Sequence, residues 1–125
     1  MPPMSVPSIL VVDDSPSLRR MIAACLRAAG YAVTEAADGD QARALAMATG
    51  FDMLLTDQVM PGTDGLTLIR TLRATERYAG IPILMLTTEA DERIREQARE
   101  AGASGFLPKP FDPGQLMAAV AALAG

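Results

Sequence analysis

Short apolar runs alternate with helical segments about five times along this chain, and this alternation limits the possible folds more than any other feature. The apolar runs, which predict strands, cover residues 9–12, 31–35, 53–56, 81–86 and 105–107. Apolar residues recur at helical spacing from residue 16 to a stop at Gly30, then over 40–49, 66–74, 91–101 and 113–123. The pattern predicts an α/β domain with a parallel sheet and helices on both faces.

Local signals support these boundaries. Ser15 and Asp112 each precede a proline, which is typical of a helix start. Gly102 ends the fourth predicted helix, and Pro82 lies near the start of the fourth strand, where proline is tolerated. Residues 1–8 contain three prolines and no periodicity. We predict a short disordered lead there and a single domain over residues 9–125.

Composition excludes several classes of function. The 15 acidic residues outnumber 11 Lys and Arg and give a net charge of −4, which argues against nucleic-acid or anionic-membrane partners. No apolar run is long enough for a membrane span, and the N-terminus does not resemble a signal peptide. A single cysteine fits a reducing compartment, so we expect a cytoplasmic protein. With no histidine in the chain, histidine-based catalysis and metal ligation are impossible.

Polar residues follow four of the predicted strands. Asp13 and Asp14 follow the first, Asp57 the third, Thr87 the fourth and Lys109 the fifth. Because the carboxyl ends of parallel strands lie at one edge of a sheet, these side chains should converge. Clustered carboxylates repel one another unless a cation neutralises them, and Mg²⁺ prefers such oxygen ligands.

This set of residues is sufficient for phosphoryl transfer. One carboxylate can act as a nucleophile and form an aspartyl phosphate, while Mg²⁺ and Lys109 stabilise charge on the phosphoryl oxygens. Each residue alone has a simpler interpretation. Asp13 and Asp14 could cap a helix, Asp57 could occupy a turn, and Lys109 could be a solvated surface charge. Their joint position at the ends of separate strands favours a common site.

The motifs also resemble those of a known family, the two-component response-regulator receiver domain. They are the runs LVVDDS at 10–15, TD at 56–57 with MP at 60–61 and DG at 64–65, LT at 86–87, GASGF at 102–106 and KPF at 109–111. The resemblance extends from Ile9 to the end of the chain. It implies a flavodoxin-like (βα)₅ doubly wound sheet with the strand order 2-1-3-4-5.

The resemblance assigns roles in phosphorylation. It implies that Asp57 is the phosphoacceptor and also a ligand of Mg²⁺. Asp14 would bind the metal directly, Asp13 through water, and Val59 through its backbone carbonyl. Val59 and Glu89 occupy positions where the family tunes dephosphorylation.

Lys109 would pair with the phosphoryl group, and the resemblance implies a cis peptide bond between Lys109 and Pro110. Thr87 would be the switch hydroxyl and Phe106 the switch aromatic. Phe106 lacks the hydroxyl of the tyrosine found in many members. Thr88 stands where alanine is common and is expected to crowd its loop, and Thr63 replaces a residue that is often apolar.

Three other classes of protein fit these residues less well. A haloacid-dehalogenase-type phosphatase needs a second aspartate two residues after its nucleophile, and Val59 stands there. A flavodoxin-type FMN binder needs a phosphate-binding first loop, which Asp13 and Asp14 would repel. A receiver used only as an interaction module usually lacks the acceptor or the lysine.

The sequence therefore predicts a monomeric phosphoacceptor signalling protein, not an enzyme, although with the family's self-phosphorylation and autodephosphorylation chemistry. Little sequence follows the last predicted helix, so the domain is expected to act by docking on another protein. Its expected partners are a sensor histidine kinase or a histidine phosphotransfer domain and a downstream target in chemotaxis, with the flagellar motor as one candidate. The alternative is a phosphorelay shuttle or an adaptor receiver in another two-component pathway.

Overall fold

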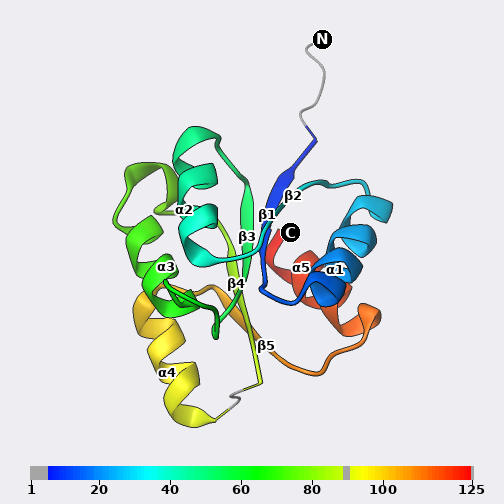
Figure 1. Ribbon diagram of the computed structural model, residues 1–125. Coiled ribbons are helices and arrows are strands. Elements are labelled where there is room, and N and C mark those ends of the chain that lie inside the picture. Colours follow the sequence, from blue (N-terminus) through cyan, green and yellow to red (C-terminus); the bar gives the residue numbers. More distant parts are fainter. Residues whose placement is uncertain (1–5, 89–90, 125) are drawn as a thin grey trace.

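The computed structural model describes residues 6–88 and 91–124. Strands and helices alternate through this range (Figure 1). The strands are β1 (Ser8–Val12), β2 (Ala32–Ala36), β3 (Met53–Asp57), β4 (Ile83–Thr87) and β5 (Gly105–Pro108). The helices are α1 (Pro16–Ala28), α2 (Gly39–Ala48), α3 (Gly65–Arg73), α4 (Glu92–Ala101) and α5 (Pro113–Ala124), with a short 3₁₀ helix η1 (Glu76–Tyr78) after α3.

The strands form one parallel sheet in the order β2-β1-β3-β4-β5, which confirms the predicted topology. Helices α2, α3 and α4 cover one face and α1 and α5 the other (Figure 1). Within the described ranges, no helix is long and apolar enough to cross a membrane.

Alternate residues of the inner strands supply two separate cores. Leu10 and Val12 of β1 belong to the core beneath α2, α3 and α4. Ile9 and Val11 belong to the core beneath α1 and α5. Since successive side chains of a strand point to opposite faces, a continuous apolar run is what a doubly covered strand requires.

Several boundaries differ from the sequence predictions. β1 begins at Ser8, which pairs with Ala32 of β2, so Ser8 belongs to the sheet and not to the predicted lead. Residues 1–5 of that lead lie outside the described residues. β4 begins at Ile83 instead of Ile81, because Pro82 has no N–H to pair and contributes only its carbonyl to Leu54. The 3₁₀ helix was not predicted.

Tyr78 in this 3₁₀ helix is buried, and its hydroxyl lies 2.6 Å from the Ala46 carbonyl and 2.9 Å from that of Thr49. It therefore caps carbonyls at the end of α2, which no further helical turn can satisfy. Replacing Tyr78 with Phe should lower the free energy of unfolding by about 1–3 kcal/mol, since the carbonyl of the buried Ala46 loses this donor. Urea denaturation checks this value, with the Tyr31→Phe variant as a control. Equal stability of the two variants would contradict the role of the hydroxyl.

Candidate phosphorylation site

The first acidic residue of the site ends β1. The N–H of Asp13 donates to the Ala36 carbonyl of β2 over 3.2 Å, and this is the last such bond between the two strands. Asp13 Oδ1 then accepts the N–H of Ser15 at 2.9 Å, which turns the chain toward α1. Ser15 caps α1 by accepting the N–H of Leu18. Asp13 is 0% exposed, whereas the neighbouring Asp14 is exposed.

Asp57 is the last residue of β3, one position beyond the predicted strand, and it is 6% exposed. The next residue, Gln58, is also buried and joins β3 to the start of α3. Its side-chain Oε1 accepts the N–H of Leu66 at 2.8 Å, and its backbone carbonyl accepts that of Gly65 at 2.9 Å. These two bonds tie the residue that follows Asp57 directly to the first turn of α3.

Lys109 provides the positive charge of the site. Its Nζ lies 2.9 Å from Asp13 Oδ2 and 3.3 Å from Asp57 Oδ2, and its side chain is 14% exposed. The N–H of Lys109 donates to the Thr87 carbonyl over 2.8 Å, and the Lys109–Pro110 peptide bond is cis. The ends of β1, β3 and β5 thus meet at one ammonium group.

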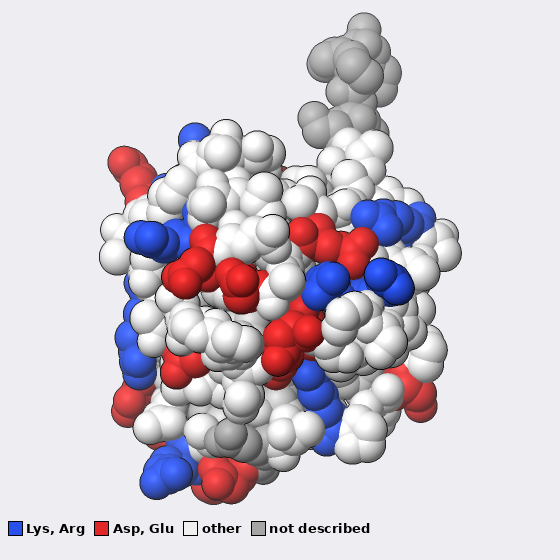
Figure 2. Space-filling model, in the orientation of Figure 1, with Lys and Arg blue, Asp and Glu red and all other residues white. Residues whose placement is uncertain are grey.

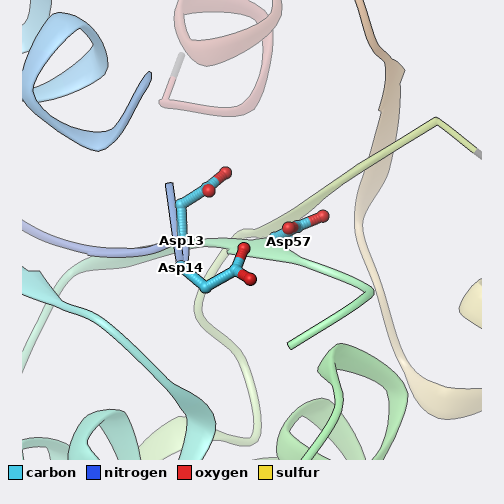
Figure 3. A group of neighbouring side chains, drawn as sticks. All are labelled: Asp13, Asp14 and Asp57. Atoms are coloured by element: carbon cyan, nitrogen blue, oxygen red, sulfur yellow. The ribbon is translucent and has the colours of Figure 1, made fainter. Parts of the chain in front are cut away.

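Asp13, Asp14 and Asp57 each place a carboxylate oxygen within 4.8 Å of the others (Figure 3). Figure 2 shows acidic side chains gathered near the middle of this face of the molecule, with basic side chains beside them. Burial raises the pKa of Asp57 above its ordinary value of 3.8, Lys109 opposes this rise, and Asp13 adds to it. The lysine therefore neutralises this cluster only in part.

The donor set fits a hard divalent cation. All three groups offer carboxylate oxygens, and the site contains no histidine because the chain has none. Oxygen-only sites of this kind, with room for water, suit Mg²⁺ better than softer metals. A cation would also relieve the repulsion that one ammonium leaves unbalanced.

The remaining predicted residues lie around this cluster. Thr87 is buried at the end of β4, one position past Leu86, the register partner of Asp57. Phe106 is half-buried in β5, and the Arg95 guanidinium of α4 lies 5.3 Å from its ring centroid. Val59 is exposed two residues after Asp57.

The positions at which this chain departs from the family pattern have different surroundings. Thr63 donates its hydroxyl to Asp40 Oδ1 over 2.7 Å, linking the loop before α3 to α2. Thr88 is exposed, which gives no sign of the expected crowding. Glu89 lies outside the described residues.

Sequence reasoning missed two residues that shape the site, Gln58 and Arg19. Arg19 of α1 donates from Nη1 to the Asp13 carbonyl over 2.8 Å. The sequence did contain a signal for Arg19. It precedes Ala23 and Leu26 at the i+4 and i+7 spacing of one helix face, and both of these residues are buried, so Arg19 lies on the inward face of α1. No comparable signal distinguishes Gln58.

The family model described as the response regulator receiver domain matches residues 9–121. The chemotaxis protein CheY of Pseudomonas aeruginosa is 43% identical over 104 residues, which cover 82% of this chain and 84% of that protein. Chemotaxis protein CheY4 of Vibrio cholerae has a similar structure, with a TM-score of 0.92 and 38% identity over 95% of this chain and 99% of that chain.

Longer regulators are similar as well. The DNA-binding dual master transcriptional regulator RpaA of Synechocystis sp. is 39% identical over 94% of this chain, which covers 49% of that protein. The chain thus spans about half the length of this relative and of the phosphate regulon regulator PhoB of Pseudomonas aeruginosa.

Proposed function

The chain belongs to the response regulator receiver domain family, and from that premise we propose that it is a signalling switch operated by phosphorylation of Asp57. The observation that supports this most directly is the position of Lys109 between Asp13 and Asp57, beside a third carboxylate. Both oxygens of Asp13 already accept hydrogen bonds, from Ser15 and from Lys109. Asp13 is 0% exposed and Asp57 6%, so Asp57 is the more accessible nucleophile of the two buried carboxylates.

In the proposed reaction, a carboxylate oxygen of Asp57 attacks the phosphorus of a phosphohistidine on a sensor kinase or phosphotransfer domain. The phosphorus–nitrogen bond breaks as the aspartyl phosphate forms, and the released imidazole takes a proton from water. The Lys109 ammonium, already within reach of Asp57, pairs with the negative charge on the phosphoryl oxygens. Asp13, Asp14, Asp57 and the backbone carbonyl of Val59 would hold Mg²⁺, which supplies further charge neutralisation.

Phosphorylation is proposed to act on partners through Thr87 and Phe106. Thr87 ends β4 next to the acceptor strand, and Phe106 lies on the adjacent β5. Movement of the Thr87 hydroxyl toward a phosphoryl oxygen would open space that the Phe106 ring can occupy. A ring without a hydroxyl has no polar atom to satisfy on burial. We expect the resulting change in partner affinity to be about 1–3 kcal/mol.

Similarity to chemotaxis proteins favours a cytoplasmic, monomeric receiver in chemotaxis, with the flagellar motor as one candidate target. The net charge of −4 argues against direct contact of this domain with nucleic acid. The alternative is a phosphorelay shuttle or adaptor receiver in another pathway.

The proposal is tested with acetyl phosphate as the phosphoryl donor. With Mg²⁺ present, intact-mass spectrometry should show the addition of one phosphoryl group, and excess EDTA should prevent it, because the clustered carboxylates then repel the donor. As a control, Mg²⁺ added in excess over the EDTA should restore the addition of the phosphoryl group. A chain that stays unmodified with Mg²⁺, or is modified equally in EDTA, contradicts the proposed function.

The switch is tested with beryllofluoride, a mimic of the phosphoryl group. Its binding should shift the Phe106 ring resonances in the parent protein. In Thr87→Ala the mimic should still bind, but most of the Phe106 shift should disappear, because the hydroxyl that couples the two positions is gone. Thr87→Ser, which keeps the hydroxyl, should respond like the parent. An undiminished Phe106 shift in Thr87→Ala would exclude Thr87 as the coupling residue.

A further inference from the structure

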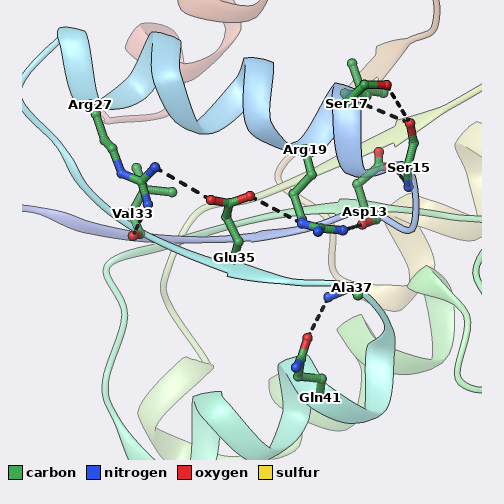
Figure 4. A network of polar contacts seen from close by, with 10 residues as sticks. Asp13, Ser15, Ser17, Arg19, Arg27, Val33, Glu35, Ala37 and Gln41 are labelled. Carbon is green, nitrogen blue, oxygen red and sulfur yellow. Dashed lines mark hydrogen bonds and ion pairs between the residues drawn. The ribbon is translucent and has the colours of Figure 1, made fainter.

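A partly buried polar network joins α1 and β2 to the end of β1, at the edge of the acidic cluster (Figure 4). Arg19 is its central residue. The Arg19 guanidinium donates from Nη1 to the Asp13 carbonyl over 2.8 Å, and its Nε lies 3.3 Å from Glu35 Oε1. We propose that Arg19 is a positioning residue that fixes the Asp13–Asp14 peptide, and thereby Asp14, for cation binding; this inference rests on the proposed function.

The need for such a residue arises where β1 stops pairing. The register of β1 with β2 ends at Val12 and Ala36, and the N–H of Asp13 makes the last bond to β2. The carbonyl of Asp13 instead accepts the guanidinium of Arg19. Because a peptide group is planar, this bond also fixes the N–H of Asp14 and the direction in which the chain continues.

Asp14 depends on this bond more than Asp13 does. The Asp13 side chain is held at both oxygens by Ser15 and Lys109. Asp14 is exposed, so its placement depends mainly on the backbone that leads into it. Weakening the Arg19 bond should therefore disturb the exposed ligand while the buried one keeps its contacts.

Glu35 holds the guanidinium in place. Its second carboxylate oxygen lies 3.6 Å from Arg27 Nη1, and Arg27 in turn donates to the Val33 carbonyl over 3.0 Å. The Arg19 side chain is only 16% exposed, so solvent screens its own contact with Glu35 less than it screens that of the half-exposed Arg27. Arginine contacts Glu35 and the Asp13 carbonyl through two donors of one rigid, planar guanidinium group. Lysine has a single ammonium group and lacks this fixed geometry.

The effect of removing Arg19 on Mg²⁺ affinity distinguishes a positioning role from a role of its charge. Arg19 is a cation near a cation site, so loss of its charge alone should tighten Mg²⁺ binding. Loss of positioning should weaken it, by roughly tenfold if Arg19 acts like other residues that orient metal ligands. The neighbouring Arg20 is exposed and provides a matched control of the same charge on the same helix turn.

The experiment compares Arg19→Gln, Arg19→Lys and Arg20→Gln with the parent by NMR. In metal-free protein, the ¹³C resonance of the Asp13 carbonyl should shift in both Arg19 variants and stay unchanged in Arg20→Gln. In Mg²⁺ titrations, affinity should fall roughly tenfold in Arg19→Gln and also fall in Arg19→Lys, which keeps the charge. Arg20→Gln should bind Mg²⁺ as tightly as the parent or more tightly.

The inference is overturned if Arg19→Gln binds Mg²⁺ as tightly as Arg20→Gln, or if the Asp13 carbonyl resonance does not move. If Arg19→Gln does not fold, two other variants serve in its place: Arg19→Lys, and Glu35→Gln, which removes the carboxylate that holds the guanidinium. The Asp13 carbonyl resonance and the Mg²⁺ affinity are measured in both. The carbonyl resonance is read without metal and without phosphoryl donor. A parent protein that accepts no phosphoryl group would therefore refute the proposed function and leave this measurement valid.

Discussion

Replacing Asp57 with asparagine is expected to abolish phosphorylation by acetyl phosphate, even though the variant folds. An amide oxygen is a far weaker nucleophile than a carboxylate, and Asp13 is held at both oxygens by Ser15 and Lys109. Intact-mass spectrometry at early times should show no added phosphoryl group in Asp57→Asn. Asp52→Asn, which alters a carboxylate at the opposite end of β3, should react like the parent. Equal modification of Asp57→Asn and the parent would contradict the assignment.

The same variant should be more stable than the parent in metal-free buffer at neutral pH. Burial raises the pKa of Asp57 in the folded protein, so the ionised carboxylate costs stability relative to the unfolded chain. As the pH falls through this raised pKa and below 3.8, the parent becomes protonated in both states and the advantage of Asp57→Asn should disappear. Thermal melting across that pH range measures the difference. An advantage for Asp57→Asn that grows with acidity would contradict this explanation.

Gly65→Ala is expected to have the second large effect, on both stability and the site. A Cβ at Gly65 would lie 2.3 Å from the Asp57 carbonyl oxygen and 2.9 Å from the Cα of Gln58. Both are backbone atoms, so α3 or the end of β3 must move. We expect a loss of about 2–3 kcal/mol in the free energy of unfolding, as for other overpacked sites. Phosphorylation should slow as well, because Asp57 would shift relative to Lys109.

Gly80→Ala is the matched control, because no atom lies within 4 Å of its added Cβ and the residue is exposed. Its stability should stay within about 0.5 kcal/mol of the parent. Denaturant unfolding and the acetyl phosphate reaction measure both variants. Equal stability of Gly65→Ala and Gly80→Ala would show that α3 can move away from β3 at little cost.

Much of the fold follows from local pattern. The run at residues 9–12 predicts a strand covered on both faces, and its residues divide between the two cores. Helix starts at Ser15 and Asp112 also follow from residue chemistry, and both side chains cap their helices as predicted. The strand order came from the family resemblance, since periodicity does not say which strands are neighbours.

The sequence also predicted one part of the candidate site and left another part open. Asp13, Asp14, Asp57 and Lys109 could be grouped from sequence because parallel strands present their carboxyl ends at one edge. The pattern did not show that Asp13 is buried while Asp14 is exposed. Nor did it show that Lys109, which is distant in sequence, pairs with the buried Asp13 and Asp57 and, among the described residues, not with Asp14.

By itself, the sequence determined the alternation of strands and helices and the residues at the strand ends, because side-chain periodicity and capping are local properties. Only the tertiary structure decided that Arg19 reaches the Asp13 carbonyl while Arg20 faces solvent, and that Gly65 must lack a side chain beside Asp57. Adjacent residues of the same type look alike in a sequence. The helix rotation and the close approach of separate segments, which distinguish them, arise only when the whole chain packs.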